Sequence, residues 1–537
     1  DDKPIELLHA ATMQKVTPKT DDSEESPGDH YIMFDKDVHL RHGDTELFAD
    51  RAYHYPDLDL LRLRGNVMID DDSVRVWFEE GEYNTQSKNI NVTTPIRILY
   101  DARHFSAASL SGNLDKDTYS AYGDVSVRDS SSYAYADSLY FDREAERAYL
   151  YGNAFMADTV NHLTMRGSEI AYHLDTDRFY GYRDASVYET LSDGTKRFEV
   201  FAKYLEGDTK GGWLIAVDSV SVLQDSSSAF CDSLFYLDSL QNVTFYGDAH
   251  VQYKNIDMYS PEISLRFRGS GLDVLNADHN PRVSLSETGF LGDKEGEPVT
   301  KSSVMTGRSL KLIFNEEDNP ERMDMAGMVI SDYHVFKDSV YKGINHMRSD
   351  TVRIFFNKGE VSNIYAVFEV EGLFTPDTSY SEMDTNAVYH GMYAHYDLGK
   401  DLMYVYPQAN MRYGEIKLHA DTMKIDWNTN LLYAYSPPGG PRPEFIQGDD
   451  PPVYGNLFEY NLETKRGRIT RGKTNIKEGY YHGRSVMKTE SEPLFVTQGV
   501  FTTCDLDEPH FCIEAKRMKV VPGDRVFAQD IVFKIAD

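Results

Sequence analysis

The chain is 537 residues long, which is more than one typical hydrophobic core can serve, so it must form several domains or a repeat array. Its formal net charge of −32 argues against nucleic-acid binding, because phosphate contacts need clustered Lys and Arg. Aromatic residues make up 12% of the chain, with 37 Tyr and 27 Phe, and polar residues interrupt the apolar ones every few positions, which is typical of strands and turns.

The first predicted segment is the head, at 1–29. IELLHAATM, at 5–13, has the composition of a strand, and DDSEESPGD, at 21–29, predicts a disordered insertion. No apolar run approaches the roughly 18 residues of a membrane helix, and no signal-peptide core opens the chain. We therefore expect a soluble, processed export substrate or an excised segment, and the sequence does not separate the two.

A repeat occupies the segment 30–435. Asp50, Asp137 and Asp232 are each followed by a glycine at one constant spacing, in segments that share several other letters. The first two copies are related by steps of 29 residues. The position that closes each unit is Gly65, Thr94, Gly123, Gly152 and Gly181 in turn, so four of the five are glycine. Recurrence at a fixed spacing indicates stacked structural repeats.

Each 29-residue unit predicts two strands of about eight to ten residues with their turns, because apolar residues alternate instead of recurring at helical spacing. Counted from the closing glycine, the second and fourth residues on both sides are mostly apolar. A glycine at the centre of such a strand predicts a bend, a bulge or a close backbone approach. The predicted fold class is therefore all-β, an elongated solenoid of stacked two-strand repeats.

The apolar face of the closing strand is the candidate binding surface. Its residues are Leu61, Leu63, Val67, Ile69, Val125, Val127, Leu150, Met156, Val243, Phe245 and Val251. If the two sheets of the solenoid meet, these residues are packed core; if the sheets splay apart along one edge, the same residues line a trough for a lipid. Small inner residues such as Ala121 and Ala154 favour spare volume, but periodicity alone does not decide.

The repeats become less regular toward the C-terminus. Copies at 347–356, 418–435 and 453–470 keep a polar opening residue followed by alternating apolar residues, and the Pro/Gly-rich stretch at 436–452 predicts a linker. The predicted domains are the head at 1–29, the repeat array at 30–435, the linker at 436–452 and a C-terminal β segment at 453–537.

An enzyme is the first alternative class. Its carboxylates would have to converge in a cleft, whereas the many Asp residues here stand at repeat and turn positions. The chain has no HExxH zinc motif and no GxSxG nucleophile elbow. We therefore expect no catalytic residue, no metal and no cofactor. A structural or adhesive surface protein is the second alternative, because acidic, Tyr-rich strand repeats also serve that role.

The amino-acid sequences of the repeats resemble those of a known family. ADSLY at 136–140 with YGNA at 151–154, and FADRAY at 48–53 with RGNV at 64–67, resemble the OstA-like repeats of the lipopolysaccharide-transport proteins LptA, LptC and the periplasmic part of LptD. The segment 479–537, with TTC at 502–504 and Pro509, looks like the segment that leads into the transmembrane barrel of LptD. The chain is most similar to that protein without its barrel.

This resemblance implies a β-jellyroll with a V-shaped trough that carries lipopolysaccharide across the periplasm, with the acyl chains inside. The implied location is the periplasm of a Gram-negative bacterium, in association with the outer membrane. The implied partners are lipopolysaccharide, other Lpt-type jellyroll proteins arranged end to end, and the outer-membrane barrel with its lipoprotein plug. Nucleic acid is not an expected partner.

The resemblance also bears on the cysteines. In the family, the cysteine that matches Cys504 forms a disulfide with a remote part of the chain or with the barrel. Cys512 can serve as its partner only if the two Cα atoms come within about 7 Å. Cys504 and Cys512 are thus the disulfide candidates, whereas Cys231 stands where other repeats have Ala and predicts a buried, unreactive thiol.

Overall fold

The computed structural model describes residues 5–16, 30–71, 74–160, 162–190, 196–224, 227–269, 271–293, 295–379, 383, 385–476, 479–488, 493–504, 506, 509–521 and 525–535. It confirms the all-β prediction, because the described strands belong to one mostly antiparallel sheet. By internal contacts the chain divides into two compact units, Asp1–Ala249 and His250–Asp537. Two helices of the 3-10 type, η1 (Pro56–Leu58) and η2 (Asp238–Leu240), interrupt the described strands of unit 1.

The strands of unit 1 are β1 (Ile5–His9), β2 (Thr12–Val16), β3 (Tyr31–His42), β4 (Thr45–Tyr55), β5 (Leu60–Asp71), β6 (Val74–Asn84), β7 (Asn89–Val92), β8 (Ile96–Tyr100), β9 (Arg103–Ala107), β10 (Ser109–Asn113), β11 (Thr118–Arg128), β12 (Ser132–Asp142), β13 (Arg147–Asp158), β14 (Leu163–His173), β15 (Arg178–Thr190), β16 (Lys196–Asp208), β17 (Trp213–Gln224), β18 (Ser227–Leu237) and most of β19 (Asn242–Tyr253).

The strands of unit 2 are β20 (Ile256–Arg268), β21 (Gly271–Asp278), β22 (Arg282–Phe290), β23 (Pro298–Thr306), β24 (Ser309–Phe314), β25 (Pro320–Lys337), β26 (Val340–Asn357), β27 (Glu360–Pro376), β28 (Ala387–Asp397), β29 (Leu402–Tyr406), β30 (Ala409–Tyr413), β31 (Ile416–Ala420), β32 (Thr422–Asp426), β33 (Leu431–Tyr435), β34 (Glu444–Gln447), β35 (Val453–Tyr454), β36 (Leu457–Asn461), β37 (Gly467–Ile476), β38 (Gly479–Lys488), β39 (Leu494–Thr502), β40 (Phe511–Val521) and β41 (Arg525–Ile535).

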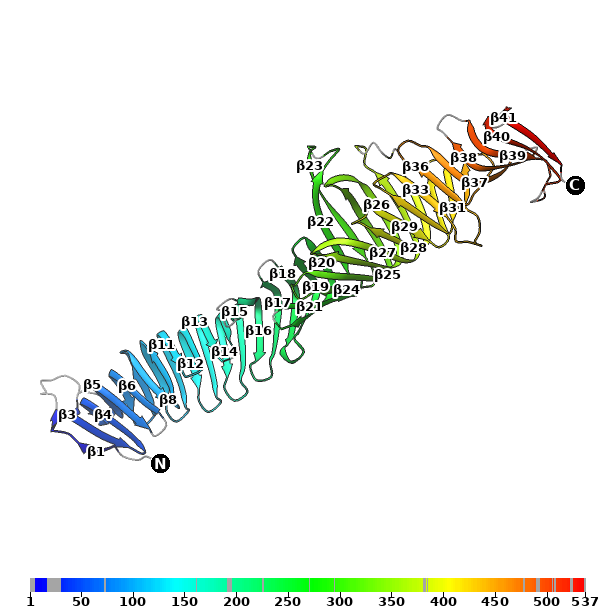
Figure 1. Cartoon of the computed structure of the whole chain (residues 1–537). Helices are drawn as coiled ribbons and strands as arrows, with labels where there is room; N and C mark the ends of the chain where they lie inside the picture. Colours follow the sequence, from blue (N-terminus) through cyan, green and yellow to red (C-terminus); the bar gives the residue numbers. More distant parts are fainter. Residues whose placement is uncertain are drawn as a thin grey trace. The chain divides into compact units, whose positions relative to one another are not determined.

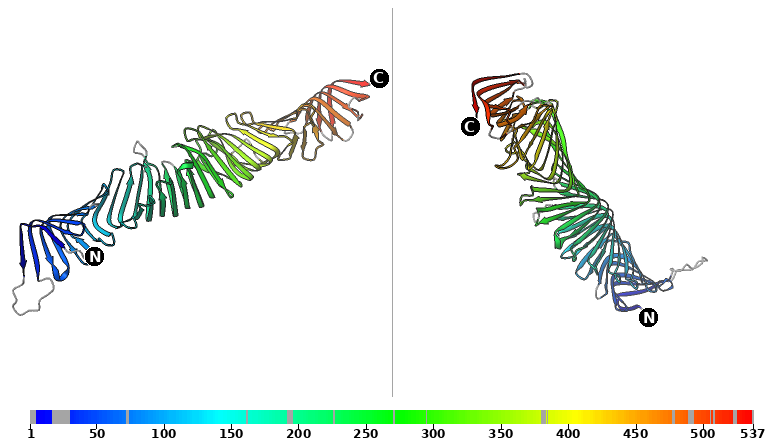
Figure 2. Two further views of the ribbon diagram at one scale, coloured as in Figure 1. Left: turned by 90° about the horizontal axis from the view of Figure 1, so that it is seen from below. Right: turned by 90° about the vertical axis from the view of Figure 1, so that its right-hand side faces the viewer.

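Antiparallel pairing runs along the chain within unit 1. β11 pairs with β12, β12 with β13, and so on to β18. Figure 1 shows β11 to β18 side by side in the order of the chain, and Figure 2 shows the same stacking from two further directions. Consecutive strands are neighbours because each hairpin turn returns the chain directly onto the strand before it.

Most long strands of unit 1 bend in the middle. In the β12–β13 pair the register shifts between Tyr135 and Ser138, and Gly152 and Asn153 on β13 both have positive φ, at 70° and 45°. This is a β-bulge, which bends and twists a strand. The bends divide the sheet into two arms: in β12 and β13, residues 132–135 and 155–158 lie on the first arm, and residues 138–142 and 147–151 lie on the second.

The two arms of unit 1 face each other across an apolar interior. The ring of Tyr100, on the first arm, lies 6.4 Å from the ring of Phe141 on the second. Inner residues next to the bends are almost fully buried, including Leu61, Leu63 and Val67. The alternation that the sequence shows therefore separates an inner face from an outer one.

The repeated Asp and Gly residues meet at the bends. A Cβ atom added to Gly65, which has a φ of 76°, would lie 2.5 Å from Asp50 Oδ2. Asn66 Nδ2 donates a hydrogen bond to the same oxygen at 2.9 Å, and Asn153 Nδ2 donates to Asp137 Oδ2 at the same distance. The prediction of a bulge with a close approach is confirmed, and this contact explains why Asp and Gly recur at a constant spacing.

The structure corrects one position of the predicted repeat. Gly181 is not a bend residue, because the bend of β15 lies at Arg183 and Asp184, whose φ angles are 57° and 55°. In the β11–β12 hairpin, the paired residues next to the bend are Tyr122 and Ser138. In the β13–β14 hairpin the corresponding pair is Tyr151 and Glu169, and two more residues separate its members along the chain. The longer hairpin therefore moves the next bend two residues beyond the predicted position.

The head and the predicted linker can also be located. The segment predicted as one strand contains β1 and the start of β2, and both strands pair with β3. The predicted disordered insertion at 21–29 lies outside the described residues. β34 lies within the predicted linker and pairs with β31 and β35. The domain boundaries predicted from composition stay predictions.

Candidate functional site

A pocket of about 500 Å³ lies between the two arms of unit 1. Its apolar lining comes from strands β5 to β14 on both arms and includes Ile98, Phe105, Val127, Leu139, Leu150 and Met156. Residues of the hairpin turns also line it, among them Val160, which is 67% exposed. The pocket is therefore apolar inside and reaches solvent along the rims of the arms, which are formed by these turns.

Four of the predicted inner residues line this pocket: Ile69, Val127, Leu150 and Met156. Three of them stand four residues from a closing glycine, and Leu150 stands two residues from one. Seven others, which are Leu61, Leu63, Val67, Val125, Val243, Phe245 and Val251, are buried and are not among its lining residues. The predicted face is thus part pocket and part packed core, and distance from the closing glycine does not separate the two, because Leu61 and Val251 also stand four residues from one.

Several lining residues were missed by the sequence-based prediction. Leu139 and Phe141 follow Asp137 on the opening strand of the repeat, whose apolar face was not considered. The same alternation, counted from the opening Asp instead of the closing Gly, would have identified Leu139 and Phe141. Ile98 and Phe105 lie on the short strands β8 and β9, where the closing glycine of the repeat is replaced by Thr94.

Paired charges occupy one rim of the pocket. Arg143 Nη1 lies 3.4 Å from Asp117 Oδ1, and the ammonium group of Lys210 contacts Asp177. The hydroxyl of Tyr119 donates to Asp117 Oδ1 at 3.4 Å. Burial, together with the charge of Asp117, raises the pKa of Tyr119 to about 12, so the phenol stays neutral and remains a donor at ordinary pH.

The same arrangement recurs farther along this rim. The hydroxyl of Tyr172 donates to Asp177 Oδ1 at 3.1 Å, and burial with the nearby Asp177 charge raises the pKa of Tyr172 to about 12. On the opposite rim, Arg103 Nε lies 3.7 Å from Asp129 Oδ2. An apolar interior between polar, charge-paired rims suits an amphiphile whose chains are inside and whose polar part is in solvent.

The three cysteines are free thiols. Cys504 Sγ lies 3.5 Å from His510 Nδ1, and the Cys504 N–H donates to Thr502 Oγ1 at 3.0 Å. Cys231 and Cys512 are buried, and burial raises the pKa of Cys231 to about 12. The pairing of Cys504 with Cys512 stays a prediction.

The described residues contain neither a metal-binding cluster nor a membrane-spanning helix. No three His, Cys, Asp or Glu side chains in that part of the chain are grouped so that they could hold a metal ion. Among the same residues, no helix has the length and apolar character needed to cross a membrane.

Comparison with known proteins gives partial likenesses to solved structures. No protein-family model matches the chain, and no curated protein matches it. The crystal structure of LptH, described as the LptA homologous periplasmic component of the conserved lipopolysaccharide transport device from Pseudomonas aeruginosa, is similar over 28% of this chain and 95% of that chain, with 13% identity and a TM-score of 0.22. A TM-score of this size does not establish a shared fold.

Proposed function

We propose that the protein is a non-enzymatic carrier that holds the acyl chains of lipopolysaccharide in the unit 1 pocket on the way to the outer membrane. The observation that carries the proposal is the pocket itself, in which Ile69, Val127, Leu150 and Met156 come together between two arms. Its volume falls in the range of about 300–1,000 Å³ that is common for ligand pockets. The choice of lipopolysaccharide as the lipid comes from the resemblance of the Asp–Gly repeats to OstA-like repeats.

The energetics of such binding need little besides apolar area. Each buried CH₂ group contributes roughly 0.8 kcal/mol, so a few methylene groups suffice for useful affinity without a dedicated polar site. The net charge of −32 repels phosphates, so the head group belongs outside the pocket, in solvent or beside the rim cations Arg103, Arg143 and Lys210.

The proposed setting is the periplasm, with Lpt-type jellyroll proteins stacked end to end and an outer-membrane barrel with its lipoprotein plug as partners. β41 supports strand-to-strand association. It pairs with β40 on one side, and Phe527, Ile531 and Phe533 on it are more than half exposed. A partner strand that pairs with β41 would cover part of these side chains. A structural or adhesive surface protein remains the alternative.

Site-specific photo-crosslinking tests the proposal. A photoreactive residue is placed at Val127 or Met156, which line the pocket, and at the adjacent outward position Arg128 as a matched control. After incubation with purified lipopolysaccharide, adducts are expected at the two inner positions and not at Arg128. Equal adducts at inner and outer positions, or none at either, would overturn the carrier function and favour the structural alternative.

A further inference from the structure

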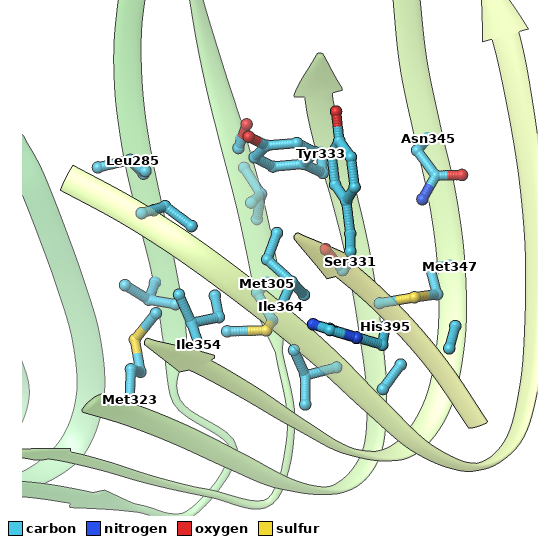
Figure 3. Close-up of a pocket in the computed structure, with 18 of the residues that line it drawn as sticks. Leu285, Met305, Met323, Ser331, Tyr333, Asn345, Met347, Ile354, Ile364 and His395 are labelled. Carbon is cyan, nitrogen blue, oxygen red and sulfur yellow. The ribbon is translucent and has the colours of Figure 1, made fainter. Parts of the chain in front are cut away.

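Unit 2 has a small pocket of its own, about 100 Å³ in volume. It lies between two arms that are set by bends such as those of β25 at Met328 and β27 at Phe368, both with positive φ. Figure 3 labels ten of its lining residues, among them Leu285 and Met305. This pocket repeats the interior of unit 1 on a smaller scale and adds no new kind of site. The outer face of unit 1 differs, because exposed rings gather there.

A row of five side chains crosses the outer face of the second arm of unit 1, one on each strand from β11 to β15. The members of this outer row are Tyr122, Ser138, Tyr151, Glu169 and Tyr182, and each stands directly opposite the next in the pairing register. Directly opposed residues of an antiparallel sheet point to the same face. That face is the outer one, because Leu150, next to Tyr151, lines the inner pocket. Figure 1 shows these strands side by side.

Two rings of the outer row have free faces. Tyr122 is 53% exposed and Tyr151 is 38% exposed. Within the described residues, no contact with another ring or with a cation involves either of them. The outer face of unit 2 differs, since Tyr365 and His395 stack on each other there at 4.1 Å and 5°. The faces of Tyr122 and Tyr151 are thus available to a ligand.

A second row of residues widens this surface. Tyr140, Tyr149, Ala171 and Tyr180 also stand opposite one another in the register. Ala171 is only 2% exposed although it lies on the outer face, so the flanking rings of Tyr149 and Tyr180 shield it. Rings that lie over a small neighbour turn their faces toward solvent, and together the two rows form a broad aromatic surface.

The preference of tyrosine for strands does not by itself account for the outer row. Tyrosine is common in strands, and Tyr122 and Tyr151 each stand one residue before a closing glycine. In the first repeat that position holds Arg64, whose Nη2 lies 2.7 Å from Glu80 Oε1 on the next strand. The fold therefore accepts a cross-strand ion pair at this position, and the repeated tyrosine points to a ligand.

The spacing of the rings selects the shape of that ligand. Neighbouring strands lie about 4.7–4.9 Å apart, so rings on every second strand repeat at roughly 9–10 Å. This distance is close to the length of a disaccharide in an extended, β-linked glycan. The C–H groups on the face of a sugar ring pack against the electron-rich face of an aromatic ring. A linear glycan across the strands therefore meets a tyrosine at every second sugar.

The polar members of the outer row suit neutral hydroxyl groups. Burial, and then the charge of Glu169, raises the pKa of Tyr151 and Tyr182, so both phenols keep their protons and can donate. Arg183, the cation next to Tyr182 in the chain, has its Nη2 3.6 Å from Glu169 Oε2. A carboxylate whose nearby cation is already paired accepts hydrogen bonds from sugar hydroxyls and repels a polyanion.

We infer that the outer row binds a linear, uncharged, β-linked glycan laid across strands β11 to β15. Tyr122, Tyr151 and Tyr182 stack on alternate sugars, and Ser138 and Glu169 accept hydrogen bonds from the sugars between them. This glycan is separate from the carried lipid, because the outer row and the pocket lie on opposite faces of the sheet. The inference goes beyond the proposed carrier function and does not depend on it.

Isothermal titration calorimetry of the full chain with defined oligosaccharides tests the inference. Chitohexaose is uncharged and β-linked, and it is long enough to reach three rings of the outer row, whereas chitobiose reaches one. We expect chitohexaose to bind roughly tenfold or more tightly than chitobiose. Maltohexaose, which is α-linked and coils, and hexagalacturonate, which is anionic, should bind more weakly than chitohexaose. Equal or tighter binding of either one would overturn the inference.

Substitutions then locate the binding site. Tyr151→Ala removes the central ring and should weaken chitohexaose binding roughly fivefold to tenfold, whereas Tyr151→Phe keeps the ring and should retain most of the affinity. The control Tyr135→Ala removes a tyrosine that is 48% exposed on the first arm of β12 and should leave binding unchanged. Melting temperatures confirm that each variant folds. Equal losses in Tyr151→Ala and in the control, or no binding of chitohexaose at millimolar concentration, would overturn the inference and leave the carrier function untouched.

Discussion

At the residue scale, the bend of each repeat depends on an Asp and a Gly that were recognisable by their spacing. The glycine supplies a positive φ that other residues adopt only with strain, and the missing Cβ leaves room for the Asp carboxylate. The carboxylate in turn accepts a hydrogen bond from the Asn that follows the glycine, as Asp137 does from Asn153. The Asp and the Gly therefore stabilise the same bend from two neighbouring strands.

Gly152→Ala is expected to lower the free energy of unfolding by about 2–4 kcal/mol, because it adds backbone strain and a clash with Asp137. Gly292 is a matched control. It also has a positive φ, of 76°, but its surroundings within 4 Å are open, so Gly292→Ala should cost only about 1 kcal/mol. Urea unfolding followed by circular dichroism measures both. Equal decreases in the free energy of unfolding for the two variants would show that the contact with Asp137 does not contribute to the bend.

Tyr119 gives a pH dependence with a defined sign. Burial raises its pKa to about 12 in the folded protein, from the ordinary 10.0. The folded state therefore holds the proton more tightly, and the stability present below about pH 10 is lost as the pH rises toward about 12. Tyr119→Phe should weaken this decline by about 2 kcal/mol at the upper end. Parallel pH profiles of the wild type and the variant, from urea midpoints, would contradict the assignment.

At the element scale, the arms persist even where the bend glycine is absent. Position 94 of the repeat holds Thr, and the strand is divided there into β7 and β8. Thr94 Oγ1 accepts the N–H groups of Glu79 and Glu80 at 3.2 and 3.0 Å and lies 3.2 Å from the Glu80 carbonyl oxygen. At this bend the hydroxyl of Thr94 forms hydrogen bonds with backbone groups that would otherwise lack a partner.

Thr94→Val is expected to destabilise the protein by about 1–3 kcal/mol, because it keeps the shape of the side chain but leaves two backbone donors without their acceptor. Thr94→Ser retains the hydroxyl and should cost less than about 1 kcal/mol. Amide exchange measured by mass spectrometry should show faster exchange at residues 79–80 in the Val variant only. Equal exchange in both variants would mean that the corner does not depend on the hydroxyl.

At the scale of the whole molecule, each of the two units has a pocket between its arms. The period, the apolar face and the all-β class followed from the sequence, because strand alternation and bend glycines are local patterns. The division of the inner face did not, because Leu150 and Val125 both stand two residues from a closing glycine, and only the three-dimensional packing places one at a pocket and the other in the core. The unit 2 pocket was missed because β25, β26 and β27, with 18, 18 and 17 residues, depart from the 29-residue period.

Strand repeats of this kind contact mainly their neighbours, so local damage should stay local. In the Gly152→Ala variant we expect amide exchange to quicken in β12 to β15, which pair in series around the altered bend. Exchange in β25 to β28 should be unchanged, because these strands belong to the other compact unit and share no pairing with β13. Hydrogen exchange followed by mass spectrometry under native conditions resolves both regions in one experiment. A uniform increase across both units would mean that the chain opens as a single cooperative body, and a single free energy of unfolding would then describe it.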